Sequence, residues 1–148
     1  MIDKTYTTMD FSKKEIEHCY GKNVHILCDP VSLGQLADLC QASTIQPTIN
    51  YLVCELYQFM IRSVVRFEFP TQAQTINTRM SRISSLGVWS GIVTKKETKT
   101  VTVNVMRAGA LPSQVSFDFF NRILNPNFVR QDHVVMSRTT NNRSEEHT

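Results

Sequence analysis

TVTVNVMRAGALP, residues 100–112, opens the stretch of sequence that decides the fold. β-Branched residues alternate through its first seven positions, a pattern typical of a β-strand. A helix is expected at 113–124, where apolar side chains recur at helical spacing until N-P-N at 125–127 ends it. FVRQDHVVMSR, residues 128–138, contains a second strand. A strand, a helix and a strand in such short succession predict a right-handed βαβ crossover with parallel strands.

The same stretch predicts an anion-binding site. Ligands of open parallel sheets bind beyond the carboxyl ends of the strands, where Arg107 follows the first strand and Arg138 ends the second. Ala108 and Gly109 have little or no side chain, so their backbone N–H groups can approach a ligand closely. The helix that begins near Pro112 adds its positive end. Two guanidinium groups and a helix N-terminus favour phosphate or pyrophosphate, whereas the alternative is that each arginine only caps a strand end in solvent.

Upstream of this unit, the pattern predicts an arm and two helices. Asp29 before Pro30 places a capping residue ahead of a first-turn proline, which marks the start of the first helix. Pro47 opens a longer helix, whose apolar positions keep helical spacing to about Val65. The remaining expected elements are a polar arm at 1–22 with a possible short helix at 12–20, and an extended segment or short strand at 24–27.

Residues 73–95 change to β-branched composition with glycine breaks. They predict a small antiparallel piece with strands at 75–78 and 88–94 and a turn at 95–99. The fold class is therefore α/β, with N-terminal helices, a small antiparallel β segment and a parallel-sheet core. We expect one incomplete domain over 1–148, divided into an arm (1–22), helices plus β segment (23–95), an anion-binding βαβ core (96–138) and a polar tail (139–148).

Composition excludes several classes of protein. Hydrophobic residues make up 41% of the chain and charged residues 20%, proportions typical of a globular protein rather than a disordered one. The net charge of +3 is spread along the sequence, which argues against nucleic acid and suits a small polyanion. Apolar runs are too short for a membrane span and no secretory signal is visible, so a cytoplasmic protein is expected. Four cysteines without a C-x-x-C pair predict free structural thiols, with Cys40 and Cys54 on apolar helical faces; a zinc site or disulfides are the minor alternative.

VNVMRAG at 103–109 resembles the strand and I-L-R-A-G-L loop of uracil phosphoribosyltransferases, and HVVMSR at 133–138 looks like that family's next strand. The resemblance implies a type I phosphoribosyltransferase that converts uracil and phosphoribosyl pyrophosphate to UMP and pyrophosphate in pyrimidine salvage. It also implies a homodimer, Mg2+ bound together with phosphoribosyl pyrophosphate, and a cis peptide bond between Arg107 and Ala108. The residues that would bind the pyrophosphate are Arg107, Ala108, Gly109 and Arg138.

The chain also departs from the family pattern. The family's ribose-phosphate loop, an aspartate followed by T-G-G-[ST], is expected after Arg138 and does not occur in the 148 residues. The chain alone is therefore expected to make no UMP. The alternative function is a non-catalytic phosphate- or nucleotide-binding protein, with a regulatory or interaction role.

Four other polar residues in or near predicted strands need an account. His25 and His133 have no nucleophile pattern nearby, so structural roles are expected rather than general-base roles. Asp132 is expected to face solvent. Asn104 is unusually polar for a buried strand, and the sequence alone assigns it no function.

Overall fold

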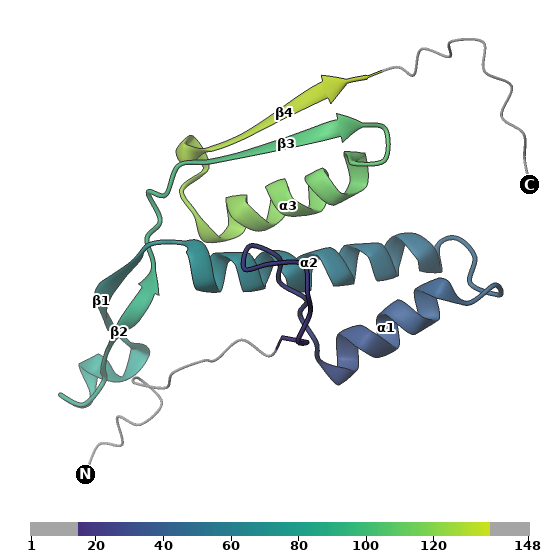
Figure 1. The fold of residues 1–148 in the computed structure, drawn as a ribbon. Helices are drawn as coiled ribbons and strands as arrows, with labels where there is room; N and C mark the ends of the chain where they lie inside the picture. Colours follow the sequence, from purple (N-terminus) through teal and green to yellow (C-terminus); the bar gives the residue numbers. More distant parts are fainter. Residues whose placement is uncertain (1–14, 137–148) are drawn as a thin grey trace, which may run out of the picture.

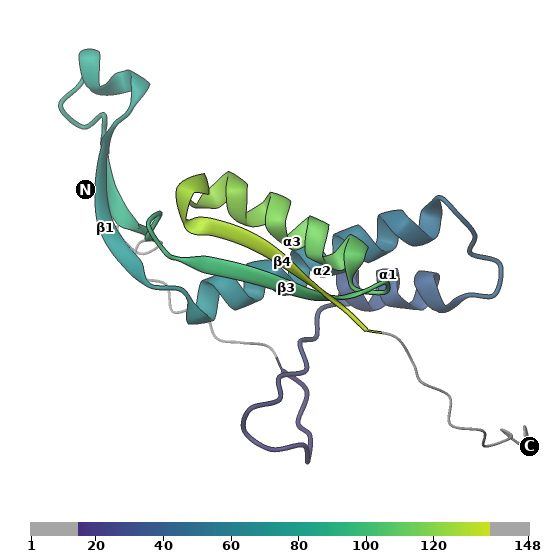
Figure 2. The same cartoon turned by 90° about the horizontal axis from the view of Figure 1, so that it is seen from above.

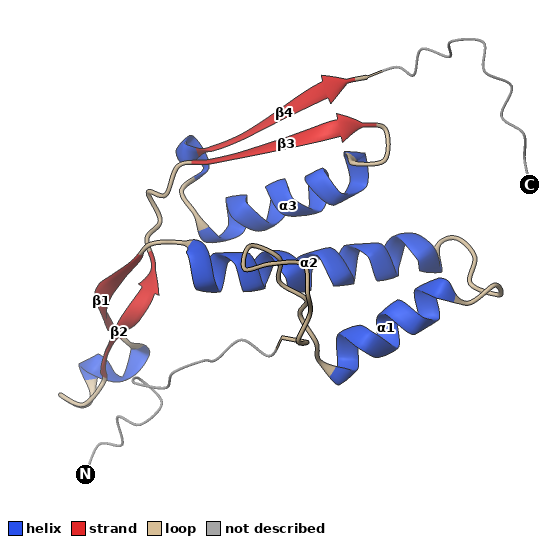
Figure 3. Cartoon of the chain, viewed as in Figure 1, coloured by secondary structure: helices blue, strands red, loops and turns tan. Residues whose placement is uncertain are grey.

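The computed structural model describes residues 15–136, which form a mixed α/β fold with three α-helices and two small sheets (Figure 1). The expected α/β class is confirmed. In chain order the elements are α1 (Pro30–Cys40), α2 (Thr48–Glu68), β1 (Thr71–Asn77), η2 (Arg79–Arg82), β2 (Val88–Thr94), β3 (Thr100–Met106), α3 (Ala110–Ile123), η3 (Pro126–Phe128) and β4 (Val129–Val135). Figure 3 shows the helices in blue and the strands in red. In chain order, α1 and α2 precede every strand.

The predicted βαβ unit is present. β3 and β4 pair in parallel, with Asn104 opposite His133 in the register, and α3 packs against both strands. β3 has the boundaries expected from the sequence. This pair is the only parallel sheet in residues 15–136, so these residues do not contain a full phosphoribosyltransferase core.

The core lies between α2 and α3, which run side by side beneath the β3–β4 sheet in Figure 1. The Phe120 ring stacks on Phe69, with ring centroids 5.6 Å apart, and meets Phe119 edge-on. The expected apolar side of α3 is therefore the buried one. The cluster of buried side chains consists of Ile61, Val65, Val115, Phe119, Phe120 and Leu124.

Capping fixes the start of α1 as the sequence predicts. Asp29 Oδ1 accepts hydrogen bonds from the Val31 and Ser32 amides at 3.0 and 3.1 Å, and Pro30 occupies the first turn. Hydrogen bonds from the Ser32 side chain and amide, and from the Val31 amide, lower the pKa of the Asp29 carboxyl. Since no helix in the described part of the chain is long and apolar enough, none could span a membrane.

Two helix boundaries differ from the sequence expectation. α2 continues to Glu68, three residues past the expected end, before the chain turns extended at Phe69. α3 begins at Ala110 instead of Ser113, so Pro112 lies inside its first turn. Proline is tolerated there because the N–H that it lacks would have no partner within the helix.

The expected arm helix is wrong over residues 15–20. Glu15 forms an isolated antiparallel bridge with Leu27, and no strand forms at 24–27 beyond that bridge. Residues 1–14 of the expected arm and the polar tail from 137 onward lie outside the described residues.

Residues 95–99 contain the expected turn, in which the Thr98 amide donates to the Lys95 carbonyl at 3.2 Å, but this turn does not join the two antiparallel strands. β1 and β2 form the predicted antiparallel pair, but they are joined by residues 78–87, which include η2. Residues 95–99 instead carry the chain from β2 to β3, which belongs to the other sheet. Figure 2 shows the β1–β2 hairpin projecting away from the βαβ unit.

All four cysteines are free, as predicted. Cys54 is partly buried on α2, but Cys40 is exposed at the end of α1, so the expected apolar environment of Cys40 is wrong.

Candidate anion-binding site

The loop Arg107–Gly109 makes a tight turn between β3 and α3. The Gly109 amide donates to the Val105 carbonyl at 3.2 Å, and the Ala110 amide donates to the Arg107 carbonyl at 3.1 Å. A Cβ atom at Gly109 would lie 3.0 Å from the Val105 oxygen and 3.1 Å from Asn104 Cβ. Close packing of the loop on β3 therefore favours glycine here. The cis peptide bond is Met106–Arg107, one bond earlier than the expected Arg107–Ala108.

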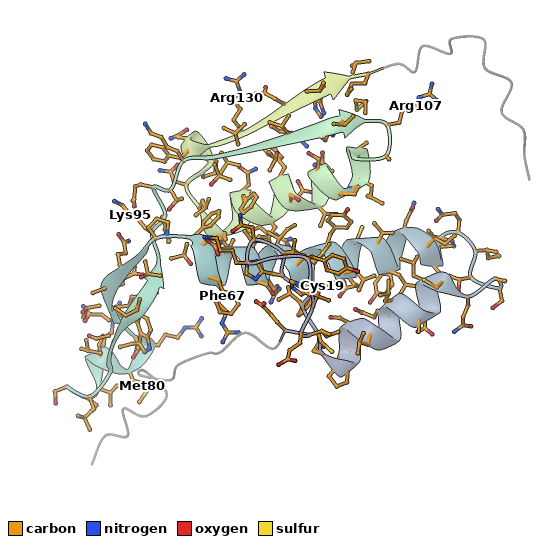
Figure 4. All side chains as sticks on the ribbon, in the orientation of Figure 1. Cys19, Phe67, Met80, Lys95, Arg107 and Arg130 are labelled. Carbon is orange, nitrogen blue, oxygen red and sulfur yellow. The ribbon has the colours of Figure 1, made fainter. Side chains whose placement is uncertain are left out.

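Arg107 is exposed at the carboxyl end of β3, and its side chain projects from the loop in Figure 4. The Arg107 side chain has neither a hydrogen bond nor an ion pair with any of residues 15–136. Arg130, by contrast, lies on the amino-terminal half of β4 and forms an ion pair with Asp132 at 2.9 Å. Arg107 is thus a cation whose charge no described side chain neutralises.

The N-terminus of α3 lies beside Arg107. Its N-cap is Gly109, which provides no side-chain cap, and the first turn carries no acidic residue. The partial positive charge of this helix end is therefore not offset locally. A cation and an uncapped helix N-terminus at one end of the sheet favour a bound anion.

Asn104 anchors the loop from below. Its side chain is only 5% exposed, its Nδ2 donates to the Gly109 carbonyl at 3.4 Å, and its Oδ1 lies 2.9 Å from His133 Nδ1. One buried amide therefore connects β3, the loop and β4. Next to it, Gln131 Nε2 donates to the Ser113 hydroxyl at 2.8 Å and links β4 to α3.

A cavity of about 680 Å³ opens beside the loop. Its lining includes residues 102–109, Tyr57, Ile61 and Val64 from α2, and residues of α3 between Pro112 and Phe120. The volume falls within the range of small-molecule sites, which is roughly 300–1,000 Å³. The sequence did not predict Tyr57 as part of the cavity wall, because nothing in the apolar stripe of a helix distinguishes a residue that lines a cavity from one that packs in the core. The sequence did distinguish Asn104, because it is the one amide side chain in a strand of mainly apolar and β-branched residues.

The other candidate residues have separate positions. Arg138 lies outside the described residues, so it adds no geometry to the site. Asp132 pairs with Arg130 and is partly exposed. His133 and His25 both have side-chain partners, and His25 Nδ1 lies 3.1 Å from the Glu15 carboxylate, far along the chain from the loop.

Residues 15–136 offer no set of side chains that would hold Mg2+ without a ligand. Over residues 15–136, no group of three or more His, Cys, Asp or Glu side chains could hold a metal ion. No carboxylate is among the residues that line the cavity at the loop. We therefore derive no step through a magnesium ion.

Comparison with known proteins adds no family. No family model matches the chain, and no curated protein matches it. The likeness of residues 103–109 to uracil phosphoribosyltransferases stays a prediction from those residues.

Proposed function

We propose that this protein binds the pyrophosphate group of phosphoribosyl pyrophosphate at loop 107–109, as a uracil phosphoribosyltransferase-like protein. The observation that carries the proposal is Arg107, an unpaired cation beside the uncapped N-terminus of α3, at the carboxyl end of a parallel strand pair. Backbone amides, a guanidinium group and a helix N-terminus are the groups that bind phosphate oxygens in proteins.

In the transfer reaction these groups would act on the leaving group. As the bond from ribose C1 to pyrophosphate breaks, negative charge grows on the pyrophosphate and C1 gains oxocarbenium character. The Arg107 guanidinium would stabilise that developing charge most strongly in the transition state. The Gly109 turn and the Asn104 amide would hold the loop in place while the charge forms.

A second candidate function is a phosphate- or nucleotide-binding protein without catalysis. Residues 15–136 supply one anion loop, and the described cavity wall contains no carboxylate or histidine that could act as a general base. This arrangement supports binding more strongly than transfer. Incubation with uracil, phosphoribosyl pyrophosphate and magnesium, followed by an assay of UMP, distinguishes the two. We expect ligand binding without UMP formation by the 148-residue chain, and turnover at an ordinary enzymatic rate would favour the enzyme.

Calorimetric titration with pyrophosphate tests the binding site itself. Arg107→Ala should cost about 1.5–3 kcal/mol of binding free energy, the range for hydrogen bonds to charged groups. This corresponds to roughly 10- to 150-fold in Kd. Arg107→Lys should recover only part, since an ammonium group cannot reproduce the two-pronged guanidinium geometry.

Arg130→Ala is the matched control, because it removes the same charge from an exposed strand position away from the loop. It should leave pyrophosphate affinity nearly unchanged. Equal affinities of wild type and Arg107→Ala would show that Arg107 is only a solvated strand-end residue.

A further inference from the structure

The outer edge of β3 is an unprotected strand edge. β3 pairs only with β4 among the described strands, so every second residue turns its N–H and C=O groups to an edge that has no strand partner. Proteins usually protect such edges with charged residues or proline. β3 contains neither, whereas the neighbouring strand β4 carries Arg130 and Asp132.

The cavity of about 680 Å³ runs along this edge. Five consecutive β3 residues, 102–106, line it. Because successive residues of a strand point to opposite faces, such consecutive lining identifies the edge of the strand and not one face. The opposite wall is α2, with Tyr57, Ile61 and Val64, and α3 contributes Ser116 and Phe120. The cavity is therefore a groove between a strand edge and two helices.

The shape of this groove restricts its occupant. α2 and α3 form the wall of the groove opposite β3. A single strand that adds to the β3 edge satisfies the unpaired backbone groups without displacing either helix.

Charge sets the direction of that strand. Arg107 is the only charged residue among those that line the groove, and it lies at the carboxyl end of β3. A terminal carboxylate next to Arg107 and the α3 N-terminus places the added strand parallel to β3. Ile61, Val64 and Phe120 then face its side chains with apolar surface.

We propose that this groove binds an extended segment of a partner protein, apolar at alternate positions and ending in a free carboxylate, as a third parallel strand beside β3. The proposal goes beyond phosphate binding and does not depend on it, because the groove extends along β3 away from the loop.

The probe is a fluorescein-labelled short peptide of alternating valine and threonine with a free carboxyl end, titrated by fluorescence anisotropy. We expect saturable binding that weakens by at least about tenfold when the carboxyl end is amidated or when Arg107 is changed to alanine. N-methylation of one alternate set of peptide amides should abolish binding and methylation of the other set should be tolerated, since only one set faces β3. Equal effects of the two sets would overturn strand addition, as would the absence of saturable binding up to about 1 mM peptide.

Ser116→Trp fills the groove from α3, and Gln114→Trp is its control, because Gln114 is exposed on the same helix and does not line the groove. With both variants shown to be folded by circular dichroism, only Ser116→Trp should abolish peptide binding. Unchanged peptide binding by Ser116→Trp would overturn the proposal. Pyrophosphate titration of the same variants separates this result from a failure of the anion site.

Discussion

Replacing Asn104 with leucine should weaken pyrophosphate binding while changing stability little. The side chain is 5% exposed and makes two hydrogen bonds, to the Gly109 carbonyl at 3.4 Å and to His133 Nδ1 at 2.9 Å. Leucine has nearly the same volume and no polar atoms. Neither partner is left isolated, because the Gly109 carbonyl keeps the Ser113 amide donor at 2.9 Å and the His133 ring is open to water.

The expected magnitudes follow from those contacts. Two neutral hydrogen bonds contribute about 0.5–1.5 kcal/mol each. A leucine side chain buried in their place gives back about 1.5–3 kcal/mol relative to an exposed one. The loss and the gain nearly cancel, so the free energy of unfolding should change by no more than about 2 kcal/mol. Pyrophosphate affinity has no such compensation, since the loop loses its anchor. A loss of about 1–2 kcal/mol, or roughly 5- to 30-fold in Kd, is expected.

Urea denaturation gives the stability and isothermal titration calorimetry with pyrophosphate gives the affinity. Thr102→Val is the control. Thr102 lies two residues before Asn104 on the same face of β3, and the substitution removes its hydrogen bond to the Arg130 carbonyl. Thr102→Val should leave the affinity intact. The reasoning is refuted if Asn104→Leu binds pyrophosphate as tightly as wild type, or if Thr102→Val weakens binding equally.

Three further predictions concern the scaffold. Phe120→Ala should destabilise the protein by about 3–5 kcal/mol, because it empties the α2–α3 core, and thermal circular dichroism measures the loss. Gly91→Ala should loosen the β1–β2 hairpin and shift Trp89 fluorescence, since its Cβ would collide with the indole ring; Gly34→Ala, in open space on α1, should instead stabilise by about 0.5–1 kcal/mol. The pKa of Asp29 is lower in the folded protein than its unfolded value near 3.8, so the ionised carboxylate stabilises the fold above pH 3.8. This stabilisation is lost as the pH falls through the folded-state pKa, and Asp29→Asn should lack that loss in acid melts.

The sequence predicted the elements whose signals are local. β3 has the expected bounds because five of its seven residues are β-branched. α1 begins where Asp29 and Pro30 place it, because an N-cap acts within one turn. β1 begins at Thr71, four residues before the expected start. The sequence did not predict these residues as strand because TQAQ has little β-propensity of its own. Pairing with the β-branched strand β2 extends it.

The errors arise where structure depends on distant pairing. The lysine-rich segment 95–99 has the composition of a hairpin turn, yet it connects two sheets, and nothing within the segment records which strand its neighbours pair with. Residues 15–20 have helical composition, but the Glu15–Leu27 bridge replaces the helix. Composition sets local preference, and a backbone partner elsewhere in the chain decides between the alternatives.

The candidate site divides in the same way. Arg107, Ala108 and Gly109 are adjacent in sequence, so the predicted cluster needed only a correct strand end. The role of Asn104 depends on its register with His133, 29 residues further along the chain. The cavity wall formed by Tyr57 depends on how α2 packs against the βαβ unit. Neither the register between β3 and β4 nor the packing of α2 follows from a local sequence pattern.

The two proposals share Arg107 and the N-terminus of α3 and differ in their other contacts. Pyrophosphate would use Arg107 with the α3 N-terminus, whereas an added strand would use the same arginine at its end and the β3 edge along its length. One guanidinium group cannot neutralise both anions at once. The two ligands would therefore exclude each other at the loop, although the groove between β3 and α2 stays open to a chain whose end is uncharged.

Occupation of the β3 edge would also bury the unpaired side of a two-stranded parallel sheet, a structure that is only marginally stable by itself. A strand partner would thus stabilise the βαβ unit, and pyrophosphate would oppose that stabilisation by competing for Arg107 and the N-terminus of α3.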